Sequence, residues 1–457
     1  MHMRSTLLAR AVRLSTLAAV TAPATVLAGG FSLNEQSASA MGTANAGAAA
    51  NPENATTVLF NPAGMSQLSG TNISFGAAVL DIDAEAKRDS ISVTRDNPAV
   101  PVQPASNGGD IADPAVLPNF YLTHEVSDEI DVGFGIHAPY GLAADYDDDF
   151  AGRFFADKTE LTAIAFTPSV SVSNGQGLSM GAGLNLIYAE GRLTRYQDLS
   201  STAGPAALAL PEPYADIEGD DVGVTFRVGF LYELSDRTQF GLTAQTGTEL
   251  ELKGDAEISN VPVPPAFAST TTLNEKVTVP LAIPESVTFG ARHQLTDEVT
   301  VLAGATYAKW GRFEELDIIS RDSNGEIAGV PGAYITHITE KWKNTWQFNL
   351  GGIWQATPSW AFKAGYAWDE SPVDQFVTAR IPSADRHWLT LGTQWKDVQS
   401  GWAVDAAIGT LIFADDADVD DRYYTHQNPT QPSSPANYQG TYELSAWSAS
   451  VQVSKAF

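Results

Sequence analysis

The chain has 457 residues, of which 54 are acidic and 26 basic, so its formal net charge is −28, and it contains no cysteine. This charge argues against nucleic acid as a partner, because a phosphate backbone is bound by clustered lysines and arginines. Apolar residues make up 44% of the chain, which is enough to bury a sizeable core. After residue 30 no apolar run approaches the roughly 18–20 residues that a spanning helix needs, which excludes a helical membrane bundle.

The amino terminus has the pattern of a secretory signal peptide. Several arginines and no acidic residue precede an apolar stretch from Leu14 to Leu27, which ends at Ala28 in the small-residue form of a cleavage site. An amphipathic surface helix is the alternative interpretation, but Pro23 would break it. We therefore predict a signal peptide over residues 1–28 and export of the chain. The absence of cysteine suits a chain that stays unfolded across an oxidising periplasm.

Residues 29–69 are rich in Gly, Ala, Ser and Asn and are interrupted at Asn51-Pro52 and Asn61-Pro62. One interpretation is a flexible periplasmic tail. The other is a hatch, or plug, inside a barrel, because small side chains let backbone pack closely and the breakers prevent one long helix. We carry the hatch forward as the prediction.

From residue 70 to residue 457 the dominant pattern is period-two alternation, which is typical of strands with one apolar face. Val222, Val224 and Phe226, for example, alternate with Gly223 and Thr225. A soluble sandwich would turn the apolar face inward. Aromatic residues near strand ends favour the opposite orientation, since lipid-facing barrels carry aromatic girdles. The candidate strands are 71–82, 116–126, 130–139, 161–172, 178–193, 222–234, 238–252, 281–292, 299–310, 343–354, 360–369, 385–395, 401–413 and 443–457.

The connections between these candidate strands alternate between long and short. An even strand number with short turns on one side and long loops on the other describes a bacterial outer-membrane barrel. We therefore predict an all-β fold, a transmembrane antiparallel β-barrel of about fourteen strands. The last strand ends on Phe457, which resembles the terminal signal read by the barrel assembly machinery. We expect a monomer in the bacterial outer membrane, in contact with membrane lipid and lipopolysaccharide.

Several motifs, in collinear order over the mature chain, resemble the FadL family of outer-membrane transporters for long-chain fatty acids and other hydrophobic compounds. They are Gly30-Phe31-Ser32-Leu33-Asn34-Glu35-Gln36-Ser37, Phe60-Asn61-Pro62-Ala63-Gly64-Met65, Tyr140-Gly141-Leu142-Ala143, the segment from Asn185 to Arg195, Leu231-Tyr232-Glu233-Leu234, Ile283-Pro284-Glu285, Trp310-Gly311-Arg312-Phe313, Asp369-Glu370-Ser371-Pro372-Val373, and Ile381-Pro382 through Asp385-Arg386-His387-Trp388. Each motif is modest alone, and their order makes the resemblance specific.

The resemblance implies a barrel closed by an N-terminal hatch, with lateral release of cargo through a kink in the third strand. The residues support that location, because the third candidate strand ends at Pro139-Tyr140-Gly141, and proline cannot donate a ladder hydrogen bond. The alternative is that Pro139-Tyr140-Gly141 simply begins an extracellular loop. Asn61-Pro62-Ala63 resembles the family motif that lies at the kink.

The resemblance also implies residues that bind the ligand. Phe31 matches the hatch phenylalanine that touches cargo, and Arg195 matches a carboxylate-binding arginine. The family's lysine partner has no clear match, so Lys341 or His337 would have to replace it, which leaves room for uncharged hydrocarbons. Parity places Arg227 on the lumen face, either as another anchor or in an internal salt bridge with a carboxylate.

The acidic clusters at 145–149 and 415–421 lack the Gly and Glu positions of a calcium loop, so we predict a solvated acidic face, with weak divalent bridging to lipopolysaccharide left open. The sequence has no Gly-x-Ser-x-Gly or His-Glu-x-x-His motif, so we predict no catalytic residues, no metal site and no cofactor.

The sequence thus predicts a passive, non-enzymatic uptake channel for long-chain fatty acids or related hydrophobic molecules. Uptake of aromatic or alkane hydrocarbons by the same route is the alternative within this class. A general porin, or a structural or adhesive surface barrel, is the alternative from a different class.

Overall fold

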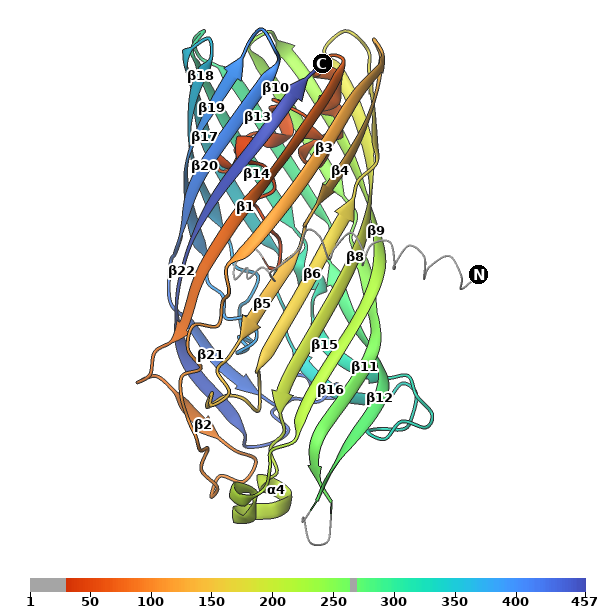
Figure 1. Cartoon of the computed structure of the whole chain (residues 1–457), viewed down its shortest axis with the longest axis vertical. Helices are drawn as coiled ribbons and strands as arrows, with labels where there is room; N and C mark the ends of the chain where they lie inside the picture. The colour runs from red at the N-terminus through yellow and green to blue at the C-terminus, as the bar shows by residue number, and fades with distance from the viewer. Residues whose placement is uncertain (1–29, 264–268) are drawn as a thin grey trace.

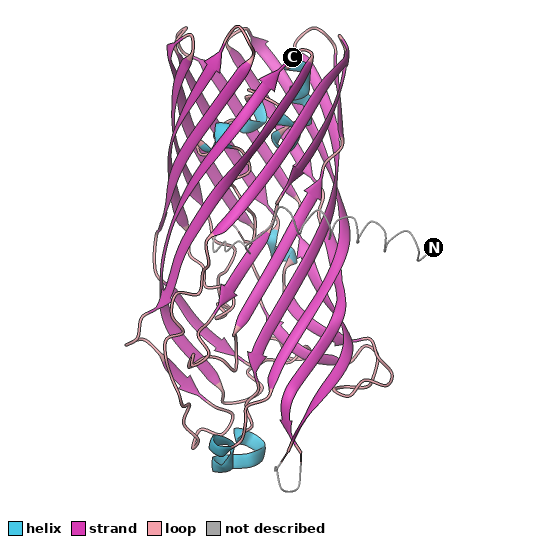
Figure 2. Cartoon of the chain, in the orientation of Figure 1, coloured by secondary structure: helices cyan, strands magenta, loops and turns pink. Residues whose placement is uncertain are grey.

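The computed structural model describes residues 30–263 and 269–457 (Figure 1). The predicted signal peptide at residues 1–28 lies outside the described residues. The described chain consists mainly of long strands, and its helices are short (Figure 2). Within these residues, no helix is both long enough and apolar enough to span a bilayer.

The strands form one antiparallel sheet that closes into a barrel. The sheet has 22 strand segments, and because several spanning strands are divided by bends, they make up 14 barrel strands. The predicted transmembrane β-barrel fold is therefore confirmed. The segments are β1 Thr71–Ala86, β2 Ser92–Thr94, β3 Ala115–Ser127, β4 Ile130–His137, β5 Gly141–Asp145, β6 Lys158–Phe166, β7 Ser169–Ser173, β8 Leu178–Tyr196, β9 Tyr214–Ser235, β10 Thr238–Gln245, β11 Thr248–Pro262, β12 Thr270–Ile283, β13 Ser286–Gln294, β14 Val299–Ala308, β15 Glu315–Ser320, β16 Tyr334–Thr339, β17 Thr345–Thr357, β18 Trp360–Asp369, β19 Arg386–Asp397, β20 Trp402–Phe413, β21 Ala417–Arg422 and β22 Asn437–Ala456.

The first and last strands close the barrel. Strand β1 pairs with β22 from Asn72 opposite Ala456 to Ala86 opposite Tyr442. The short turns and the carboxyl terminus lie at one end of the barrel, and the long loops lie at the other (Figure 1). Since outer-membrane barrels have short periplasmic turns, the long loops mark the extracellular end.

Side-chain exposure shows which face of the wall meets lipid. On β9, Val222 is 54% exposed and Phe226 is 59% exposed, whereas Thr225 between them is buried. The apolar row therefore points outward, as a lipid-facing barrel requires and a soluble sandwich does not.

The same strands reverse their polarity nearer the extracellular end. In β9 the outward positions before Val222 are the acidic residues Asp216 and Glu218, while Ala215 and Ile217 are buried on the lumen side. Strand β11 repeats the pattern with buried leucines facing the lumen. These segments extend beyond the membrane on the extracellular side. Their outer face is therefore exposed to water, and their inner face forms an apolar core.

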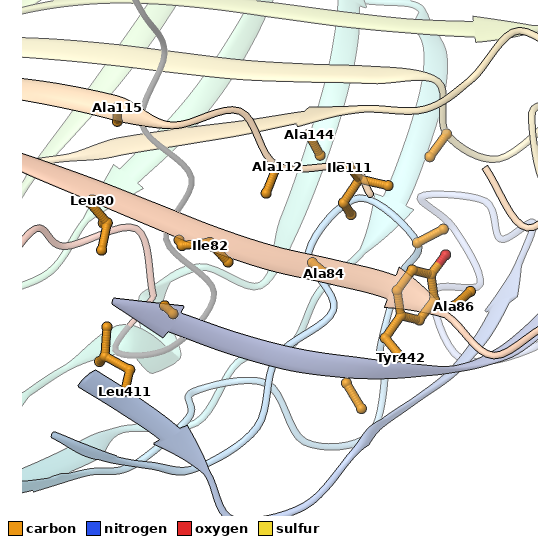
Figure 3. Close-up of a cluster of buried hydrophobic side chains, with 14 of the residues drawn as sticks. Leu80, Ile82, Ala84, Ala86, Ile111, Ala112, Ala115, Ala144, Leu411 and Tyr442 are labelled. Atoms are coloured by element: carbon orange, nitrogen blue, oxygen red, sulfur yellow. The ribbon is translucent and has the colours of Figure 1, made fainter. Parts of the chain in front are cut away.

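A cluster of inward apolar side chains marks one side of this extracellular core (Figure 3). Leu80, Ile82 and Ala84 lie along β1, and Leu411 from β20 and Tyr442 from β22 join them. The cluster fills the space between wall and loops at this end of the barrel.

The N-terminal segment, residues 30–70, which we call the hatch, lies inside the barrel at its periplasmic half (Figure 2). Its short helices are packed closely against the wall. A Cβ atom at Gly241 of β10 would overlap the carbonyl oxygen of Ala49, so only glycine permits that approach. The helices are α2 Ala38–Met41, η1 Ala48–Ala50, α3 Thr57–Phe60 and η2 Pro62–Gln67, and the loops outside the hatch carry α4 Ser200–Ala203, η3 Gly204–Ala209 and η4 Trp310–Arg312.

One buried lysine holds the hatch to the wall. The Nζ atom of Lys363 on β18 lies 2.6 Å from Glu53 Oε2 of the hatch and 3.3 Å from Asp405 Oδ1 of β20. It also donates to the carbonyl oxygen of Ser39 at 2.9 Å. Because these charges are shielded from water, removing one partner would leave the others uncompensated.

Candidate functional site

The third barrel strand is interrupted halfway along its length. Segment β4 ends at His137, and β5 begins at Gly141. The ladder between β3 and β4 stops at the pair Phe120 and Ile136, although β3 itself extends to Ala115. Segment β5 is paired with β6 on its other side. The wall is therefore divided between β3 and β5, which is where the sequence predicted a kink.

The start of the hatch covers this interruption. The amide of Leu33 donates to the carbonyl oxygen of Pro139 at 3.1 Å, and the amide of Gly141 donates to that of Phe31 at 2.9 Å. The side chain of Gln36 donates to the carbonyl oxygen of Ala138 at 2.5 Å. The freed polar groups of the interrupted strand are thus satisfied by the hatch rather than by a neighbouring strand.

Phe31 occupies the centre of an aromatic cluster. Its ring centroid lies 4.6 Å from that of Trp310 and 5.9 Å from that of Tyr140, in edge-to-face arrangements. Phe313 and Trp342 complete the cluster at 5.9 Å and 5.8 Å. The side chain of Phe31 is only 2% exposed and belongs to the buried apolar cluster of the extracellular half. Phe31 therefore connects the hatch to this cluster.

An apolar cavity of about 50 Å³ opens beside Phe31, in the extracellular half of the lumen. Leucine, isoleucine and valine side chains from seven strand segments supply most of its wall, and Arg380 also lines it. The apolar wall consists of Leu142, Leu161, Leu193, Ile217, Leu252, Val279, Leu281, Phe313, Leu316 and Ile381.

Two arginines lie near this cavity without a carboxylate in ion-pair contact, within residues 30–263 and 269–457. Arg195 on β8 donates to Thr336 Oγ1 at 3.2 Å, and its guanidinium lies 5.5 Å from the ring centroid of Tyr423. Arg380 donates to Thr159 Oγ1 and to the carbonyl oxygen of Thr194, both at 3.0 Å. The Nε atom of Arg380 is buried and has no partner in the described part of the chain.

Buried carboxyl groups set the charge around these arginines. Burial, together with the charge of Arg195, lowers the pKa of Arg380 to about 10. Burial raises the pKa of Glu340 to about 8, so this side chain is mainly protonated at neutral pH, and it raises the pKa of Asp421 to about 6. Asp421 and Asp157 are the other carboxyl groups that act on Arg380. Neither forms an ion pair with Arg195 or Arg380 within the described residues, so both guanidiniums can still donate to an anionic headgroup.

Lys341 does not join these arginines. It is exposed, its backbone has a φ of 44°, and its Nζ atom lies 6.0 Å from the ring centroid of Phe376. His337, the other proposed substitute, pairs with Asp317 at 2.6 Å. The second cation beside Arg195 is Arg380, which our sequence analysis did not single out although it directly precedes the Ile381-Pro382 motif.

Asn61, Pro62 and Ala63 lie against β8 and β9 rather than supplying the hydrogen bonds at the interrupted strand. The Asn61 side chain accepts from the amide of Ala63 at 3.1 Å and caps η2, with Pro62 at the first helical position. It also donates to the carbonyl oxygens of Ala49 and Phe230 at 2.7 Å and 3.0 Å. The motif therefore fastens the hatch to the wall.

A second, polar cavity of about 220 Å³ lies between the hatch and the wall. It reaches the interrupted strand, because Pro139 and Tyr140 contribute to its lining. Arg227 also lines it and donates to Gln245 Oε1 at 2.5 Å, with no carboxylate ion pair within the described residues. The side chain of Tyr140 stands between this cavity and the aromatic cluster around Phe31.

The closed barrel, its outward apolar belt and the folded hatch define an outer-membrane transport barrel. A family model described as "Outer membrane protein transport protein (OMPP1/FadL/TodX)" matches residues 18–457. The chain belongs to this family, whose members transport hydrophobic compounds across the bacterial outer membrane.

Individual relatives agree with this assignment. The chain is 25% identical over 457 residues to a long-chain fatty acid transport protein of Escherichia coli O6:H1, covering 94% of each chain. A Pseudomonas aeruginosa FadL homologue of known structure matches with a TM-score of 0.79 at 21% identity, covering 94% of this chain and 100% of that one. The P. putida toluene transporter TodX matches with a TM-score of 0.65 at 18% identity, covering 88% and 94%. The two structural matches support the fold.

Proposed function

We propose that this protein is a passive uptake channel for long-chain fatty acids. Arg380 lines an apolar cavity, and the guanidinium of Arg195 lies close enough to act on it. This arrangement suits a carboxylate attached to a hydrocarbon chain. A relative that covers nearly the whole chain is named as a long-chain fatty acid transporter. The observation that carries this proposal is an apolar cavity with nearby arginines that form no direct ion pair within the described residues.

Lateral release is the second part of the proposal. An acyl chain gains about 0.8 kcal/mol for each CH₂ group that leaves water, so release into water would be steeply unfavourable. Release into lipid avoids that loss. The interruption between β3 and β5 is the place where cargo can leave through the wall, once the segment from Phe31 to Gln36 moves away.

The polar cavity has a place in this route. As the tail enters the opening at Pro139 and Tyr140, the headgroup needs a partner deeper in the lumen. Arg227 lines that cavity and lacks an ion-paired carboxylate within the described residues. We therefore assign Arg227 as the cation that receives the headgroup during release.

We infer a signal peptide at 1–28, a hatch at 29–69 and a barrel at 70–457, with no catalytic activity. We further infer that the mature protein is a monomer that is inserted by the barrel assembly machinery and lies among membrane lipid and lipopolysaccharide.

Binding of radiolabelled oleate to purified protein, with toluene and unlabelled oleate as competitors, tests the cargo. We expect saturable oleate binding that toluene displaces poorly. Preferential toluene binding without oleate competition would instead assign the protein to hydrocarbon uptake.

Planar-bilayer recordings distinguish the channel from a porin. The hatch lies inside the periplasmic half of the barrel, so we expect low ion conductance. High, steady conductance that persists after removal of the hatch would favour a general porin. An unchanged uptake rate in a deletion strain would favour a structural or adhesive barrel.

A further inference from the structure

Four side chains that can ligate metal meet on the extracellular loops, outside the proposed cargo site. Glu315 and Asp317 lie on β15, His337 lies on β16, and His426 lies in the loop between β21 and β22. Their ligand atoms all lie within 4.8 Å of one another. We propose that this cluster binds one divalent transition-metal ion of the zinc class.

The fold brings these residues together in a simple way. Glu315 and Asp317 are two residues apart on one strand, so their side chains share a face. Asp317 lies directly opposite His337 in the antiparallel pair of β15 and β16. His426 arrives from a loop 109 positions further along the chain than Asp317, and its ring stacks on Tyr334 at 3.9 Å between centroids.

The distances fit a compact coordination sphere. His337 Nδ1 lies 2.6 Å from Asp317 Oδ1, and His426 Nδ1 lies 3.0 Å from Asp317 Oδ2. Glu315 Oε2 lies 3.8 Å and 3.5 Å from the same two nitrogens. Ligands bound tetrahedrally to zinc at about 2.0–2.1 Å stand about 3.3 Å apart. Only small side-chain shifts would therefore admit the ion.

The hydrogen-bond partners of His337 also indicate a cation between its Nδ1 atom and Asp317. Thr339 Oγ1 donates its proton to the carbonyl oxygen of Pro429 at 2.7 Å. It must then accept from His337 Nε2 at 3.0 Å, which fixes that nitrogen as the protonated one. In the neutral ring, the bare Nδ1 would face the Asp317 carboxylate, so two lone pairs would meet. A metal ion between them resolves this conflict, and so would a second proton on His337.

The donor set and its surroundings favour the metal. Two imidazoles and two carboxylates are ligands that zinc accepts, and Thr339 provides the outer hydrogen bond that orients a ligating histidine. The side chains of His337 and Asp317 are 2% and 4% exposed, whereas those of His426 and Glu315 are 32% and 39% exposed. Two ligands are therefore held rigidly, and the other two border a route for the ion from solvent.

Occupancy of this site would act on the neighbouring loops. Thr336, next to His337, accepts the hydrogen bond from Arg195, and Tyr423, in the same loop as His426, lies under the Arg195 guanidinium. An ion shared by the two segments would hold both partners of Arg195 in place. The metal site itself rests on its own four residues and does not depend on the identity of the cargo.

Calorimetric titration of chelator-treated, full-length protein in detergent with ZnCl₂ tests the proposal. We expect one equivalent to bind, and we expect His426→Ala and His337→Gln each to weaken binding at least tenfold. His293→Ala serves as the matched control, because His293 is exposed on β13, distant in sequence and strand position from the cluster. With Co²⁺ as the probe, the wild-type protein should show the visible absorption of a tetrahedral site, and His426→Ala should lose it.

Thermal melting of each variant checks that it has folded. Binding that is equal in the wild-type protein, His426→Ala and His337→Gln would overturn the proposal, as would the absence of Zn²⁺ binding by the folded wild-type protein. In either case, the cluster would be held together by the contacts of the two histidines with Asp317, without a metal ion. Failure of oleate binding alone would affect the proposed cargo and leave the metal site standing.

Discussion

The amide of Gly141 donates a hydrogen bond to the carbonyl oxygen of Phe31 at 2.9 Å, which joins the point where the third strand resumes to the beginning of the hatch. Ser32 and Tyr140 form an antiparallel bridge beside this bond. The hatch thus takes the place of a strand partner at the interruption. Movement of the hatch and opening of the wall are therefore one event in the proposed mechanism.

A disulfide across this bridge should lock the channel. Bridged antiparallel residues have Cα atoms about 4.5–5.5 Å apart, within the range that a disulfide spans. We expect Ser32→Cys combined with Tyr140→Cys to abolish fatty-acid uptake when oxidised and to restore it on reduction. Since the chain has no native cysteine, no competing disulfide can form. The Tyr140→Cys single variant is the control, and uptake by the oxidised pair equal to that of this control would refute lateral opening here.

Removal of the Arg195 side chain should weaken binding of anionic cargo. A hydrogen bond to a charged group contributes about 1.5–3 kcal/mol, so Arg195→Ala should lower oleate affinity about 10- to 100-fold. Binding of the uncharged methyl ester should change little. Lys341→Ala is the matched control, because Lys341 is exposed and lies over Phe376. Unchanged oleate affinity in a folded Arg195→Ala protein would exclude the headgroup role.

Oleate affinity should depend on pH through Glu340. Burial raises the pKa of Glu340 to about 8, so its proton is lost as the pH rises through this value. The new negative charge near Arg380 opposes an anionic headgroup, and affinity should fall about fivefold, equivalent to about 1 kcal/mol. Glu340→Gln cannot ionise and should flatten the profile between pH 7 and pH 9, as measured by equilibrium binding. A profile identical to that of the wild-type protein would show that Glu340 is not the titrating group.

Loss of the Lys363 ammonium should loosen the hatch. Removing one member of a buried charge group costs about 3–5 kcal/mol, and here Glu53 and Asp405 would be left uncompensated. We expect Lys363→Met to lower the melting temperature and to raise ion conductance in planar bilayers. Lys253→Met, at an exposed position on β11, should leave both unchanged. If the ion conductance of Lys363→Met is as low as that of the wild-type protein, other contacts hold the hatch in place.

Much of the barrel could be predicted because lipid imposes a strict alternation on each strand. The candidate strand at 360–369 matches β18, and every candidate strand overlaps a strand of the barrel. The prediction placed 214–221 and 253–262 in loops, but the structure shows them as parts of β9 and β11. Above the membrane the outward positions carry charge, so a rule that expects outward apolar residues does not recognise these segments as strands.

The site was less predictable, because it depends on contacts between segments far apart in the chain. The resemblance implied Phe31 and Arg195, whose roles stay predictions, and Pro139 indicated where the third strand is interrupted. Arg380 was missed because only folding brings a loop arginine beside Thr159 and Thr194. The contacts of Asn61 with β9 depend equally on the closed barrel, which no local pattern reveals.

The reversal of polarity along β9 constrains the route of a hydrophobic molecule along the wall. Above the bilayer the apolar face of the wall points toward the barrel axis, as Ile217 does. Within the bilayer the apolar face points away from that axis, as Val222 does. A molecule that stays in contact with apolar surface must therefore cross once from the lumen face of the wall to its lipid face. In the proposed mechanism, the break between β3 and β5 is that crossing, and cargo then enters the bilayer without passing through the aqueous periplasm.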